Sequence, residues 1–95
     1  MNLPSNKKEC FAQLDEILSE EDKWAIVKSK DTTEFHFTLG LWIRNHWLYK
    51  FSEEEKELFF KEFGRGIPFF DPDFISGEII EEYQKHLRKN LRSKK

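Results

Sequence analysis

The stretch from Asp31 to Tyr49 reads D-T-T-E-F-H-F-T-L-G-L-W-I-R-N-H-W-L-Y and decides the fold. At about 100° per residue it predicts a helix over residues 33–48 with apolar or aromatic side chains on almost every side. A narrow polar ridge is formed by Glu34, Thr38 and Asn45. A helix that is apolar nearly all round is normally buried, so we expect other helices to enclose this one.

A β-strand is the competing interpretation of part of this stretch. Residues 35–41 alternate strictly between the two faces of an extended chain, but the run then continues past strand length without alternation. Asp31 and Glu34 have the spacing of a helix capping box, which favours the helix. At about sixteen residues, with several polar groups, this helix is too short to cross a bilayer.

Two residues inside the predicted helix carry an energetic cost that other contacts must offset. Gly40 in a helix interior costs about 1 kcal/mol relative to alanine, and close approach of a neighbouring helix would explain it. Arg44 lies beside apolar residues and must either extend to water or pair with a carboxylate, because an unpaired buried charge is very costly. We nominate Asp71 and Asp73 as its partners.

Length and composition predict a single domain over residues 1–95, with 1–6 and 92–95 frayed. Aromatic residues make up 16% of the chain, so a few large side chains supply much of the core. The lone Cys10 excludes an internal disulfide and, with no apolar leader, favours the cytoplasm. Residues 1–84 carry a net charge of −8, whereas residues 85–95 carry +6.

The remaining elements are also predicted to be helices, so we expect an all-α bundle of about five. The first helix has one apolar face, formed by Cys10, Phe11, Leu14, Ile17 and Leu18. A short second helix follows Ser19. Ser52 and Glu55 form a capping box for a helix over 53–63 that ends at Gly64. After an irregular loop over 64–73, with Asp71-Pro72 as a helix start, a short turn to Ser76 leads to a last helix over 77–91.

Polar residues of the central stretch and the loop form the candidate site: His36, Arg44, Asn45, Asp71 and Asp73. On a regular helix His36 and His46 lie about 15 Å apart along the axis, so they cannot share a metal ion. The chain has no metal-binding, P-loop or nucleophile-elbow motif. We therefore expect no metal and no cofactor, and we assign His36 and Arg44 to structural roles first. Asn45 is expected to be solvated or to cap a neighbouring turn.

The central motif His36-x-x-x-Gly40-x-Trp42-Ile43-Arg44-Asn45-x-Trp47-Leu48 resembles the signature of a small bacterial domain family of unknown function. Further matching positions are Leu48-Tyr49, Pro72-Asp73, Ser76 and Ile79-Ile80. The resemblance covers roughly residues 10–90 and implies a compact helical domain of bacterial or phage origin. It points to no particular activity, since none is established for the family. Phe74 stands where the family has a second acid, and Tyr49 where it more often has Trp, which puts an acid-dependent activity in doubt.

Three functional hypotheses remain open, and a binding module is preferred to an enzyme. The first is a cytoplasmic protein-interaction or regulatory module that binds another protein through Ile67, Phe69 and Phe70, because the chain has more large aromatics than its core requires. The second is a small-ligand or enzymatic pocket built on His36, Arg44 and Asp73. The third is nucleic-acid binding by the basic end, which the acidic body disfavours. The sequence leaves the oligomeric state open.

Overall fold

The computed structural model describes residues 3–64 and 66–93, with side chains as far as Asn90, and every regular element in this part is helical. Five α-helices follow one another: α1 Lys7–Ile17, α2 Glu20–Lys28, α3 Leu41–His46, α4 Glu53–Phe63 and α5 Pro72–Ser93. Three short helical turns that are not α-helical flank α3. They are η1 Thr33–Phe35 and η2 His36–Gly40 before it and η3 Leu48–Lys50 after it. The predicted all-α class with about five helices is therefore confirmed.

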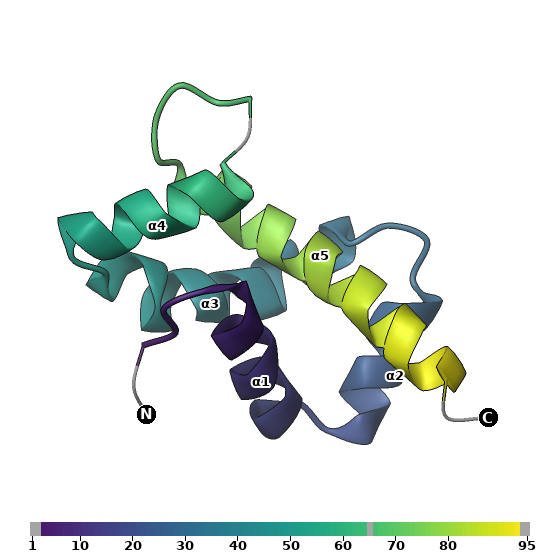
Figure 1. The fold of residues 1–95 in the computed structure, drawn as a ribbon. Coiled ribbons are helices and arrows are strands. Elements are labelled where there is room, and N and C mark those ends of the chain that lie inside the picture. Colours follow the sequence, from purple (N-terminus) through teal and green to yellow (C-terminus); the bar gives the residue numbers. More distant parts are fainter. Residues whose placement is uncertain (1–2, 65, 94–95) are drawn as a thin grey trace.

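The longest helix, α5, is the element on which the others pack. Figure 1 shows it crossing the molecule diagonally, with α4 near its beginning and α2 near its end. One face of α5 supplies much of the core: Ile75, Ile79, Ile80, Tyr83 and Leu87. The residues from η1 to η3 (33–50, hereafter the central segment) contact α5, as do α2 and α4. Helix α1 adds Cys10 and Leu14 to the same core.

The central segment is helical throughout most of its length but is not one regular helix. It begins with a 3₁₀ turn, continues through a π turn over His36–Gly40, and only then becomes α-helical. A π turn carries i→i+5 hydrogen bonds and is wider than an α turn. Side chains before and after it therefore do not keep the 100° spacing that the sequence analysis assumed.

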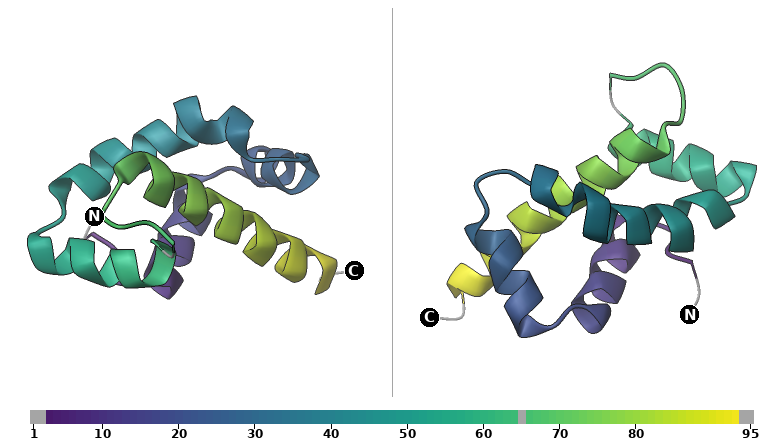
Figure 2. Two further views of the ribbon diagram at one scale, coloured as in Figure 1. Left: turned by 90° about the horizontal axis from the view of Figure 1, so that it is seen from above. Right: turned by 180° about the vertical axis from the view of Figure 1, so that it is seen from behind.

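Enclosure of the central segment is only partial. Ile43, Trp47 and Leu48 are buried as predicted, but Phe37 is 85% exposed and Leu41 is 46% exposed. Figure 2 shows the reason from behind, where the central segment lies across the near side of α5 and no other helix covers it. The expectation that other helices surround it on nearly all sides is thus wrong for one face, because α5 occupies the middle position instead.

Helix α5 begins five residues earlier than predicted. The Asp71 carboxylate accepts a hydrogen bond from the backbone N–H of Asp73 at 3.0 Å, and the Asp71 carbonyl accepts the first helical bond, from Ile75, at 2.9 Å. Pro72 thus occupies the first helical position, where its missing N–H costs nothing. The helix passes through Gly77 without interruption and continues to Ser93, so residues 92 and 93 are helical.

Polar side chains fix the ends of the helices. Ser52 and Glu55 form the predicted capping box, and Asn6 and Ser19 cap α1 and α2. Each such cap contributes about 1 kcal/mol. Of residues 3–6, which we expected to be frayed, Pro4 is fully buried, whereas Ser5 and Asn6 are exposed. Residues 1–2 and 94–95 of that prediction lie outside the described residues.

The carboxyl end of α2 is held by two side chains from α5. Gln84 Nε2 donates to the carbonyl oxygens of Ile26 at 2.8 Å and Ser29 at 3.0 Å. Arg88 donates to the carbonyls of Val27 at 3.2 Å and Ser29 at 2.9 Å. Carbonyls at a helix end have no intrahelical partner, so these contacts satisfy them and fix the position of α2.

Length and apolarity together decide whether a helix can span a bilayer. Within the described residues, none of the helices is both long and apolar enough to do so.

Candidate functional site

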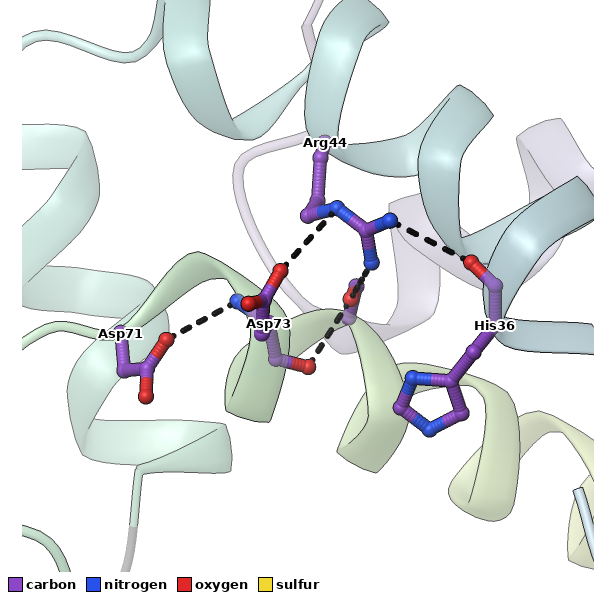
Figure 3. Close-up of polar contacts among 5 residues, drawn as sticks. His36, Arg44, Asp71 and Asp73 are labelled. Carbon is purple, nitrogen blue, oxygen red and sulfur yellow. Dashed lines mark hydrogen bonds and ion pairs between the residues drawn. The ribbon is translucent and has the colours of Figure 1, made fainter. Parts of the chain in front are cut away.

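Arg44 is the centre of the predicted polar cluster, and the structure buries it to 8% exposure. Its Nε lies 3.3 Å from Oδ1 of Asp73, and its Nη1 donates to Oγ of Ser76 at 3.0 Å. Its Nη2 donates to the carbonyl oxygen of His36 at 3.3 Å (Figure 3). All three guanidinium nitrogens therefore have protein partners, which is what a buried arginine requires.

Only one of the two nominated acids pairs with Arg44. Asp73 does so from the first turn of α5, where a negative charge also interacts favourably with the helix dipole. Its side chain is 79% exposed, so solvent screens much of the pair's energy. Asp71 caps α5 instead, and Figure 3 shows its carboxylate bonded to the backbone of Asp73.

Gly40 is buried beneath the Arg44 side chain. A Cβ built on Gly40 would lie 3.2 Å from Nη1 of Arg44 and 3.6 Å from Cδ1 of Ile80. The predicted close approach at this glycine is therefore present, but it comes from these two side chains and from the Phe35 carbonyl oxygen, 3.5 Å away, and not from the backbone of a neighbouring helix. The guanidinium lies over Gly40, and from there its Nη2 donates to the His36 carbonyl oxygen.

The His36 ring does not join the guanidinium. Only the backbone carbonyl of His36 faces Arg44, while the ring is directed away, toward α5 (Figure 3). There it lies over Gly77, where an added Cβ would be 3.1 Å from Cε1 of the ring. The two side chains therefore do not converge on a common ligand position.

A shallow pocket of about 190 Å³ lies beside the His36 ring. Its lining is largely polar and acidic: Thr32, Thr33, His36, Asp73, Phe74, Gly77, Glu78 and Glu81. Partial burial raises the pKa of Glu78, and the negative charges of Glu81 and Glu82 raise it further. No group of three or more His, Cys, Asp or Glu with metal-binding geometry occurs among the described residues.

The other predicted positions lie apart from this cluster. Asn45 is exposed on the outer face of α3. The loop after α4 protrudes from the body (Figure 1), but Ile67 and Phe70 are partly buried against the core. Lys56 Nζ lies 5.9 Å from the centre of the Phe70 ring. Phe69 is the exposed member of the trio, at 64%.

The basic end of the chain is partly used inside the fold. Arg88 binds the end of α2, and the His86 ring packs on Phe11 with the ring centres 4.8 Å apart. Lys85 and Lys89 are exposed. The side chains of Arg92, Lys94 and Lys95, which the nucleic-acid hypothesis also uses, lie outside the described residues.

A second hollow, larger than the pocket beside His36, was not predicted. It is a groove of about 480 Å³ between the α1–α2 corner and the central segment. Its lining, hereafter the apolar groove, comprises Ile17, Leu18, Asp22, Ala25, Ile26, Phe35, Thr38, Leu39 and Trp42. Trp42 is fixed there by stacking on His46, with ring centres 4.4 Å apart, and by an edge contact with Trp47.

The fold and the site describe a small helical domain whose polar cluster is internal and whose apolar groove is open. The sequence model of a family described as "Domain of unknown function (DUF6794)" matches residues 3–87, and the chain belongs to this family. The predicted relationship to an uncharacterised domain family is therefore confirmed. No curated protein and no solved structure shows a match to the chain.

Proposed function

We propose that this domain is a protein-binding module and that its binding surface is the apolar groove together with the neighbouring open face of the central segment, Phe37 and Leu41. The observation that carries the proposal is the groove itself, a hollow lined mostly by apolar side chains, and the exposure of Phe37 and Leu41 on the same segment adds to it. Large exposed apolar patches usually mark interaction sites, since they are costly to leave in water.

The composition of the groove supports binding over catalysis. Most of its lining residues are apolar, and its volume of about 480 Å³ lies within the usual range of binding pockets, roughly 300–1,000 Å³. The lining offers no nucleophile paired with a base, which an enzyme of the common hydrolytic types would need. By contrast, Arg44 and Asp73 are engaged in joining the central segment to α5, which supports a structural role for them.

Phe69 is a second candidate contact. It projects from the loop between α4 and α5 and is 64% exposed, which favours this residue over Ile67 and Phe70. A single exposed aromatic on a protruding loop suits the rim of an interface better than its centre, because hot-spot residues are normally surrounded by other contacts.

The module is proposed to act in the cytoplasm of a bacterium. Support comes from Cys10, which is a free and buried thiol, and from the resemblance of the central motif to a bacterial family. A reducing compartment keeps such thiols unpaired.

The experiment uses the groove position Ala25 and a matched position on α1. Both Ala25 and Ala12 are exposed on helices, so an arginine fits either without disturbing the core. The immobilised domain should capture a partner from its host's lysate, Ala25→Arg should lose that partner, and Ala12→Arg should keep it. Phe69→Ser is tested in the same capture experiment and shows whether the loop between α4 and α5 contributes to binding. Undiminished capture by Ala25→Arg would contradict the proposed surface.

A further inference from the structure

The apolar groove contains one negatively charged side chain, and this charge indicates which kind of partner the groove would bind. Asp22 is the one charged side chain among the nine lining residues of the described chain. It lies in the first turn of α2 beside Glu20 and Glu21, and Lys23 pairs with Glu20 at 3.7 Å. Among the described residues, no basic side chain pairs with the Asp22 carboxylate.

The shape of the surface favours a helix over a small molecule. One wall of the groove is the stretch of the central segment from Phe35 to Trp42, which contributes four of the nine lining residues. A helix with apolar side chains at i, i+3, i+4 and i+7 covers such a stretch, because its contacts recur along one face.

We infer that the occupant of the apolar groove is an amphipathic helix of another protein that places a basic side chain opposite Asp22. The inference rests on the proposed function and names the partner's chemistry. A lysine or arginine at the edge of the partner's apolar face would meet Asp22, while its apolar residues would fill the space between Ala25 and Trp42.

A second copy of this chain fits the groove poorly. The first 84 residues carry a net charge of −8, so two bodies would repel each other. The basic end is the one part with suitable charge, but Leu87 is buried in the core and Arg88 is bonded to the end of α2. Helix α5 cannot offer that face to another molecule without leaving its own core.

The test uses three synthetic helical peptides of about four turns with the same leucine positions. One carries lysine at the flanking positions, one carries glutamate, and one has the lysine sequence scrambled so that no apolar face remains. Fluorescence anisotropy should show binding of the lysine peptide and weaker or no binding of the other two. Asp22→Asn should weaken the binding of the lysine peptide by roughly twofold to fivefold and make that binding less dependent on salt concentration.

The outcomes separate this inference from the proposed function. If the lysine and glutamate peptides bind equally and Ala25→Arg abolishes both, the groove binds proteins but the charge rule is wrong. If Ala25→Arg leaves peptide binding unchanged, the groove itself is not the site. A concentration-dependent dimer that Ala25→Arg dissociates would overturn the inference in favour of a second copy.

Discussion

Arg44 Nε lies 3.3 Å from Oδ1 of Asp73, and this contact joins the middle of the central segment to the first turn of α5. The same guanidinium also binds the His36 carbonyl and Ser76, which is 32 positions further along the chain than Arg44, so one side chain links the central segment to α5. The energy of this link resides mainly in the buried hydrogen bonds, because the Asp73 carboxylate is largely in water.

Arg44→Lys should lower stability by about 1–3 kcal/mol. A lysine has one nitrogen and cannot reach three acceptors, so it leaves buried polar groups without partners. Asp73→Asn should cost less than about 1 kcal/mol, because the exposed carboxylate is screened. Urea unfolding followed by circular dichroism compares the two variants. Equal losses, or no loss with lysine, would refute the assignment of Arg44 as an internal clamp.

Gly77→Ala should interact with the His36 ring. The added methyl group would lie 3.1 Å from Cε1 and 3.2 Å from Nε2 of that ring. In the native background the crowding offsets the helix-propensity gain of about 1 kcal/mol, whereas in a His36→Ala background the gain should appear in full. A double-mutant cycle measures the coupling, expected at about 0.5 kcal/mol or more. Additive effects would show that the ring does not pack there.

Gln84→Leu should release the carboxyl end of α2. It removes the side-chain donor to the Ile26 carbonyl and one of the two side-chain donors to the Ser29 carbonyl, which keeps its bond to Arg88, at a cost of about 1–3 kcal/mol. Hydrogen exchange should accelerate at amides of α2 more than at those of α4. Lys85→Leu, at the exposed neighbouring position, is the control and should change neither. Uniform acceleration in both helices would point to global destabilisation without a specific effect on α2.

Glu78→Gln should stabilise the domain at neutral pH. Burial and the charges of Glu81 and Glu82 raise the pKa of Glu78 above its ordinary value, so the folded state binds this proton more tightly than the unfolded state. Stability therefore falls as pH rises from the unfolded pKa through the raised folded value. The variant's advantage in melting temperature should be full at pH 7, shrink as the pH falls through the raised folded-state pKa, and vanish below the unfolded-state pKa. An advantage that grows on acidification would contradict this cause.

Local signals predicted the parts of the fold that depend on neighbours in sequence. The Ser52–Glu55 capping box and the Asp71-Pro72 start of a helix are contacts within one turn, so the residues alone determine them. Arg44 could be paired with Asp73 because a buried charge must find a counter-charge and few acids were near. The start of α5 was placed too late, since the sequence analysis took Ser76-Gly77 as a break.

The predictions about the fold that were wrong concern features that depend on tertiary arrangement. A wheel drawn at 100° per residue cannot show a π turn, and the exposure of Phe37 and Leu41 depends on that turn and on the side of α5 that the central segment covers. The groove joins Ile17 and Ala25 to Trp42, which are far apart in sequence. The excess of aromatic residues predicts an interaction surface at Ile67, Phe69 and Phe70, which stays a prediction, and no pattern in the sequence indicates the groove.

The most direct test of the binding surface is an NMR titration of the ¹⁵N-labelled domain with the lysine-bearing amphipathic peptide. The account predicts that the largest shifts occur at the amides of Ala25 and Thr38 and at the indole N–H of Trp42. Shifts centred on His36 and Glu78, or confined to the loop around Phe69, would contradict it.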